Sequence, residues 1–92
     1  MDLDQPIQHS ERAVFRRLAD DEGGVLLHLD TGAYHGLNPM GVVIWNAIGE
    51  GSKLEDLVGA VRDTVADAPD DLQSDVVAFV EDLVQRDLLA LS

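Results

Sequence analysis

Hydrophobic and polar residues alternate with the two-residue period of β-strands over the first part of the chain. Three short segments of this kind follow one another: Ala13–Leu18, Val25–Leu29 and Ala33–Leu37. Residues 20–24 form a turn by composition, and Asp30–Gly32 is typical of a three-residue hairpin loop that ends in a left-handed glycine. Consecutive strands joined by short turns pair in order, so the pattern predicts an antiparallel meander. In this meander the strand Ala33–Leu37 keeps one unpaired edge.

The next apolar segment has the start and end signals of a helix. Asn38 is a preferred N-cap and Pro39 a preferred first helical residue, so a helix begins here. Residues 42–48 are apolar nearly all round, which requires burial on several sides. We expect Gly49 or Gly51 to end this helix.

A second helix is expected over residues 52–65. Ser52 and Glu55 have the spacing of a capping box, in which each side chain satisfies a free backbone N–H of the other residue. The apolar residues that follow form a single stripe at the helical period: Leu54, Leu57, Val58, Val61 and Val65.

A third helix is expected over residues 72–86, after a loop that contains Pro69 and several acidic residues. Val77 and Val84 widen its apolar face to one side. Either this wide face packs against both other helices and the sheet, or the Val77–Val84 flank lines a groove. The main stripe consists of Leu72, Val76, Phe79, Val80 and Leu83.

Three strands followed by three helices predict an α+β fold of the winged helix-turn-helix-like type, with a three-stranded antiparallel sheet before the helices. The 92 residues suit one domain over 1–92. Residues 1–12 are of mixed polarity and contain Pro6, so we expect them to form a loose lead-in. Residues 87–91 are expected to close the chain as a tail against the core.

The charge is strongly acidic, with 18 Asp and Glu against 6 Lys and Arg and a net charge of −12. Such a surface repels nucleic acid and anionic membranes, although it tolerates a neutral or basic peptide. The third helix of a DNA-reading winged helix would carry basic or amide side chains, but residues 70–87 contain six acids and only Arg86 as a base. Solubility alone is an equally good explanation of the acids; in either case, nucleic acid is not an expected partner.

The chain contains no cysteine, so it has no disulfide and no thiolate metal site. Residues 1–10 are acidic and lack the apolar segment of a signal peptide, and no apolar run approaches the length that spans a bilayer. We therefore expect a soluble, cytoplasmic protein without a membrane association.

No set of residues has the spacing of a catalytic or metal site. His9, His28 and His35 lack the helical spacing of zinc ligands, and no glycine-rich phosphate loop is present. In the second strand, Val25, Leu27 and Leu29 share one face and His28 lies on the other; we expect the hairpin histidines, His28 and His35, to face solvent. The sequence predicts a binding module with no catalytic residue, metal or cofactor.

The run VLLHLDTGAYHGLN over residues 25–38, followed by Gly41, Ile44–Trp45 and Gly51, forms a fairly specific pattern. Together with DVVAFVEDL over residues 75–83 it resembles the PqqD-like family, whose domains are recognition elements for ribosomally made, post-translationally modified peptides. The form of the motif and the free-standing length are most similar to recognition proteins of lasso-peptide pathways, which make antibiotics. One departure is Asp87, where relatives often have Gly; it puts only the end of the last helix in question.

The resemblance implies a protein that binds the leader region of a precursor peptide. In the family, the leader adds as a strand to the third β-strand and lies in a groove beside the third helix. A lasso leader with a Tyr-x-x-Pro motif would need an apolar cleft, and Glu81 could meet its basic residues. The expected peptide-binding residues are Ala33, Tyr34, His35, Gly36 and Leu37 on the strand, and Val76, Val77, Val80, Glu81 and Val84 on the helix.

The resemblance further implies an adaptor that presents the core peptide to a separate leader peptidase and lasso cyclase. Two alternatives stay open at this point. One is a winged-helix transcription regulator that works through protein contacts, and the other is a peptide chaperone of the pyrroloquinoline quinone (PQQ) type.

Overall fold

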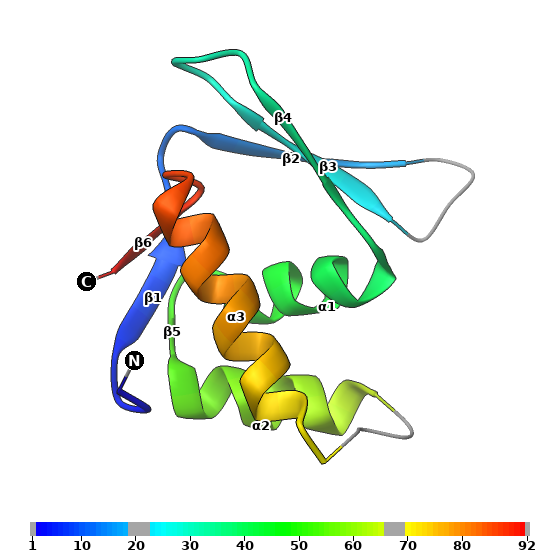
Figure 1. Ribbon diagram of the computed structural model, residues 1–92, viewed down its shortest axis with the longest axis vertical. Helices are drawn as coiled ribbons and strands as arrows, with labels where there is room; N and C mark the ends of the chain where they lie inside the picture. The colour runs from blue at the N-terminus through cyan, green and yellow to red at the C-terminus, as the bar shows by residue number, and fades with distance from the viewer. Residues whose placement is uncertain (1, 19–22, 66–69, 92) are drawn as a thin grey trace.

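Two small antiparallel sheets and three helices make up the described part of the chain in the computed structural model (Figure 1). The structure describes residues 2–18, 23–65 and 70–91. Its elements in chain order are β1 Pro6–His9, β2 Ala13–Arg17, β3 Gly24–His28, β4 Tyr34–Leu37, α1 Pro39–Ile48, β5 Ser52–Lys53, α2 Leu54–Thr64, α3 Leu72–Gln85 and β6 Leu89–Leu91.

The predicted meander is confirmed as the sheet β2–β3–β4, with β3 in the middle. Tyr34 lies opposite Leu27, and Leu27 lies opposite Val14 on the other side. The loop before β4 contains Gly32 in the left-handed region, with φ of 73°, as the hairpin composition predicts. Most of the predicted turn at 20–24 lies outside the described residues.

The expectation of a loose lead-in is wrong, because residues 6–9 form β1. This strand is the middle of a second sheet, in which Ile7 lies opposite Ser52 of β5 and Leu91 of β6. The side chain of Ile7 is fully buried. The His9 ring stacks on the Trp45 ring, with the ring centroids 3.8 Å apart. The His9 Nε2–H group also donates a hydrogen bond to the Trp45 carbonyl oxygen at 2.9 Å. Both contacts bind β1 to α1, and the tail predicted at the chain's end is the strand β6.

Helix α1 begins where the sequence predicts. The Asn38 side chain caps it, since its Oδ1 accepts a hydrogen bond from the Gly41 N–H at 2.7 Å, and Pro39 is the first helical residue. Gly49, with φ of 55°, follows its last residue. A Cβ on Gly41 would lie 3.1 Å from the Phe79 ring, so glycine here lets α3 approach closely.

Helix α2, Leu54–Thr64, is shorter than the predicted 52–65; it has four of the five residues of the predicted stripe, with Val65 at the C-cap, but not the predicted cap. Its buried residues are Leu54, Leu57, Val58 and Val61. The helix begins at Leu54, and Lys53 occupies the N-cap without a side-chain hydrogen bond. The capping box is wrong because Ser52 pairs with Ile7 as part of β5, and its hydroxyl donates to the Lys53 carbonyl.

Helix α3 crosses in front of α1 and closes the core (Figure 1). It ends one residue earlier than predicted, at Gln85. Four residues of its predicted stripe are buried and Phe79 is half-buried. No helix within the described ranges is long and apolar enough to cross a membrane. The buried residues of α3 are Leu72, Val76, Val80 and Leu83.

The starts of α1 and α2 make a stability test. Asn38→Ala removes the side-chain oxygen that accepts from the Gly41 N–H, and we expect it to lower the free energy of unfolding by about 1 kcal/mol. Ser52→Ala should change it by less than about 0.5 kcal/mol, because Ser52 caps no helix. Urea denaturation measures both values, and an equal loss in the two variants would contradict this assignment of the caps.

Candidate functional site

The outer edge of β4 is open, because β4 pairs only with β3 among the residues described. The His28 N–H donates to the Ala33 carbonyl at 2.9 Å, which marks a hydrogen-bonded pair. Such pairs alternate along an antiparallel ladder, so His35, two residues further on, also directs its backbone groups toward β3. Tyr34 and Gly36 therefore direct their N–H and C=O groups away from β3. We call this side of the strand the open edge.

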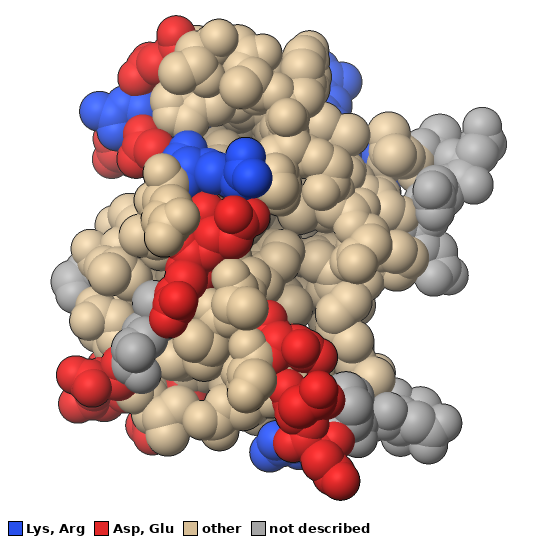
Figure 2. Space-filling view, viewed as in Figure 1, with Lys and Arg blue, Asp and Glu red and all other residues tan. Residues whose placement is uncertain are grey.

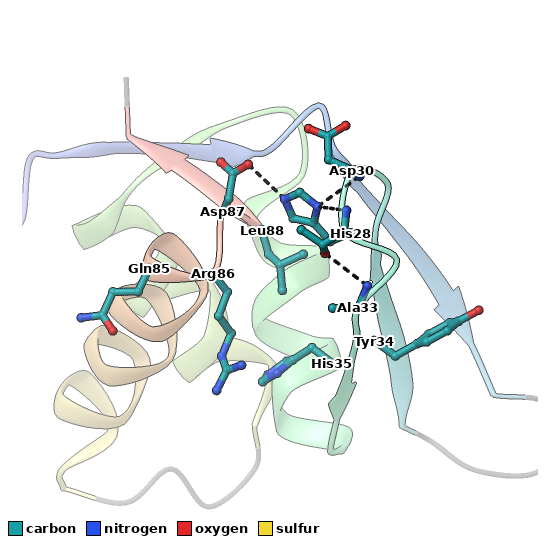
Figure 3. A pocket seen from close by; sticks show the side chains of 10 residues that line it. His28, Asp30, Ala33, Tyr34, His35, Gln85, Arg86, Asp87 and Leu88 are labelled. Atoms are coloured by element: carbon teal, nitrogen blue, oxygen red, sulfur yellow. Dashed lines mark hydrogen bonds and ion pairs between the residues drawn. The ribbon is translucent and has the colours of Figure 1, made fainter.

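The side chains of β4 alternate between two faces of the sheet. Leu37 is buried and His35 half-buried on the inner face, whereas Tyr34 is 74% exposed on the outer face. Figure 3 shows Tyr34 pointing away from the pocket and His35 pointing into it. A Cβ on Gly36 would meet no atom within 4 Å, so the strand can be approached closely at this residue.

A pocket of about 500 Å³ lies where the hairpin meets the C-terminal end of α3 (Figure 3). One wall comes from β3, the hairpin loop and the start of β4, and the other from the end of α3 and the residues before β6. Leu88 is a buried apolar residue of the second wall. The lining residues are His28, Asp30, Thr31, Ala33, Tyr34, His35, Gln85, Arg86, Asp87 and Leu88.

One flank of α3 faces β4. Asp82 Oδ2 lies 3.9 Å from His35 Nε2, and its two carboxylate oxygens each accept from Arg86 Nε at 3.2 Å. Phe79 lies on the same flank, where it packs over Gly41 at the start of α1. We call Phe79, Asp82 and Arg86 the β4-facing flank of α3. Their i, i+3, i+7 spacing shows in the sequence that they share one side of the helix, but the sequence does not show that this side faces β4.

The helix residues expected at the site are not brought to β4. Val76 and Val80 are fully buried in the core, so neither offers a surface to a ligand. At about 100° per residue, Val84 lies about 160° round the helix from Asp82, with Val77 about 140° and Glu81 about 100° away. These three residues therefore lie on other sides of α3, because the wide apolar face extends away from β4. Of the five expected strand residues, Ala33, Tyr34 and His35 line the pocket and Gly36 lies on the open edge, whereas Leu37 is buried in the core.

His28 is buried, with 7% of its surface exposed, so the expectation that it faces solvent is wrong. Leu26 and His28 take the inner face of β3, and Leu29 on the opposite face is 57% exposed. His28 Nδ1 accepts from the N–H groups of Asp30 and Thr31, at 3.2 and 3.3 Å. The alternation along β3 correctly predicts which residues share a face of the sheet. It does not predict which face is buried, because the face with more aliphatic residues, that of Leu29, is the outer one.

Charge is unevenly spread around the site. Figure 2 shows acidic side chains gathered over α3, while the fewer basic side chains are scattered and some of them stand beside acidic ones at the level of the sheet. Asp75 and Glu81 of α3 are exposed, and Asp82 is half-buried between Arg86 and His35. No group of three or more His, Cys, Asp or Glu in the described part of the chain is placed to hold a metal ion. The site offers backbone groups, apolar surface and carboxylates, which suit a neutral or basic peptide.

Comparisons with known proteins agree with this geometry. The family model described as coenzyme PQQ synthesis protein D (PqqD) matches residues 23–89. The chain is also similar to a solved structure described as TbiB1 in complex with the TbiA(beta) leader peptide. That similarity has a TM-score of 0.76 and 32% sequence identity, and covers 89% of this chain and 93% of the other. No curated protein matches the chain.

The open edge predicts a pattern of amide hydrogen exchange in the free protein. The N–H groups of Tyr34 and Gly36 should exchange faster than that of His35, because only the His35 N–H lies within the ladder. Residue-resolved exchange by NMR measures the three rates. Equal protection of all three would show that the edge is covered, for example by β4 of a second copy.

Proposed function

Since the chain belongs to the PqqD family, we propose that it binds the leader region of a ribosomally synthesised precursor peptide. The observation that carries this proposal is the open edge of β4, which lies beside an apolar pocket and one flank of α3. The TbiB1 complex supports it, because that similar structure contains a leader peptide.

The backbone of the leader pairs with β4 as an added strand. Tyr34 and Gly36 each supply one N–H donor and one C=O acceptor to the incoming chain, which adds a fourth strand to the sheet β2–β3–β4. These contacts do not depend on the leader's side chains. They give affinity, and selection among peptides must come from the surfaces beside the strand.

The side chains of the added strand that point inward meet the β4-facing flank of α3. Phe79 offers apolar surface there, and Asp82 an acceptor for a basic side chain or a backbone N–H. The pocket at the hairpin end supplies a second apolar surface with Leu88 in its wall. Two such surfaces suit a leader with two spaced anchor residues, such as the Tyr-x-x-Pro motif of lasso leaders.

The protein then acts as an adaptor of lasso-peptide antibiotic biosynthesis. It holds the leader and presents the core peptide to a separate leader peptidase and a cyclase, and carries out no chemistry itself. Membership of the PqqD family favours one further peptide class, the precursor peptide of PQQ synthesis, which would use the same open edge. Binding of the two peptide classes can be compared directly.

Calorimetric titration tests the proposal and the strand addition together. The probes are the synthetic TbiA(beta) leader and the leader of a precursor peptide encoded beside this protein's gene. We expect micromolar or tighter binding for at least one, roughly −8 kcal/mol. Gly36→Pro removes an N–H that faces the open edge and should weaken binding by at least about tenfold, whereas Gly36→Ala keeps that N–H and should bind within about threefold.

Absence of heat with every leader would refute leader binding. Equal affinity of the proline and alanine variants would leave binding intact but contradict strand addition at Gly36. Folding of the proline variant is checked by its urea midpoint, since only the outward N–H is removed and the ladder to β3 is kept.

A charge-reversal pair tests which flank of α3 forms the groove. Asp82→Lys places a cation beside Arg86 and removes the acceptor that faces His35, so we expect roughly tenfold weaker leader binding. Glu81→Lys changes the net charge by the same amount on another side of the helix, and should alter affinity by less than about twofold. Because both substitutions change the net charge equally, the difference in affinity between the two variants excludes the long-range electrostatic contribution. The opposite ranking would place the groove on the flank of Val77 and Val84.

A further inference from the structure

The residue after the C-cap of α3 has an unusual backbone conformation. Asp87 has φ of 59° and is the one non-glycine residue with positive φ among those the structure describes. Its N–H donates to the Val84 carbonyl at 3.1 Å, and the Leu88 N–H donates to the Leu83 carbonyl at 2.9 Å. These are the two hydrogen bonds of a Schellman motif, in which glycine is preferred at this position. Asp87 therefore occupies a place where a side chain is unfavourable.

The Asp87 side chain reaches from the helix end to the hairpin. Its Oδ2 lies 3.1 Å from His28 Nε2 and 3.4 Å from Arg12 Nη1. Because His28 Nδ1 accepts from the N–H groups of Asp30 and Thr31, the ring proton lies on Nε2 and is donated to Asp87. Figure 3 shows the resulting chain of contacts from Asp87 through His28 to the loop. We call these contacts the Asp87 clamp.

The clamp joins the two walls of the pocket. His28 and Thr31 belong to the wall that leads into β4, while Asp87 and Leu88 belong to the wall at the end of α3. The Gly32 N–H donates to the His28 carbonyl at 2.8 Å, so a shift of His28 shifts the loop with it. A shift of His28 would therefore change the spacing between the start of β4 and the C-terminal end of α3.

We propose that Asp87 is a positioning residue, which holds the start of β4 at a fixed distance from the C-terminal end of α3 and so sets the width of the peptide groove. The proposal rests on the proposed function for its binding effect, but the clamp itself does not depend on a ligand. It also explains why an aspartate stands where glycine would be less strained. The carboxylate fixes the ring orientation that the two loop N–H groups require.

Two substitutions separate the clamp from the backbone strain. Asp87→Gly relieves the left-handed backbone and removes the carboxylate, so the urea midpoint should change little, while affinity falls by about tenfold for whichever of the two titrated leaders, synthetic TbiA(beta) or the one encoded beside the gene, binds the wild type. Asp87→Asn tolerates the same backbone, and its Oδ1 still accepts from His28 Nε2. It loses only the ion pair with Arg12, so its affinity should stay within about twofold of the wild type.

Two further readouts need no peptide. The ¹⁵N shifts of the His28 ring should report the Nε2–H tautomer in the wild type and in Asp87→Asn, and a tautomer mixture in Asp87→Gly. The amides of Asp30 and Thr31 should exchange faster in Asp87→Gly alone. Wild-type exchange and affinity in Asp87→Gly would overturn the proposal, as would an asparagine variant that behaves like the glycine variant. If the wild type itself bound no leader, the proposed function would fail, and the ring shifts and exchange rates would still decide on the clamp.

Discussion

The burial of α1 is the constraint on which the other elements depend. Val42, Ile44, Trp45 and Ile48 leave almost no surface exposed, and α1 contacts α2, β1, β3 and β4. A helix that is apolar nearly all round requires a neighbour on each side, and each buried side chain contributes about 1.5–3 kcal/mol. Much of the inner face of the sheet β2–β3–β4 is committed to this burial, including Leu26 and Leu37. What the sheet can offer to another molecule is the edge of β4, its outer face, and the part of the inner face at His28 and His35 that lines the pocket.

The short β4 strand follows from the same constraint. Leu37 is buried in the core and Asn38 caps α1 directly after it, so β4 cannot extend further toward its C-terminal end. At its other end, Gly32 lies in the turn that connects β3 to β4, so β4 cannot extend in that direction either. A strand of this length gives few backbone hydrogen bonds, and an added peptide therefore depends on α3 and the pocket for most of its selectivity.

Local signals predicted much of the fold and little of the helix side of the site. The hairpin at Gly32 and the cap at Asn38 depend on residues within four positions, and both are confirmed. Strand β1 was missed because Ile7 pairs with Ser52 and Leu91, far away in sequence, and its few residues carry no period. Periodicity in the sequence shows which residues of α3 share a side of the helix, but not which side faces β4. The contact between His35 and Asp82 in the folded protein identifies the side that faces β4.

The pairing of β1 with β6 places Ile7 opposite Leu91, so both ends of the described chain leave from one small sheet (Figure 1). That sheet is separate from the sheet that ends in β4. A larger enzyme could carry this domain as an insertion in a surface loop, or as a fusion at either end, through connections that do not cross the open edge. The same architecture suits a circular permutant, in which a linker connects β6 to β1 and a new opening is cut elsewhere.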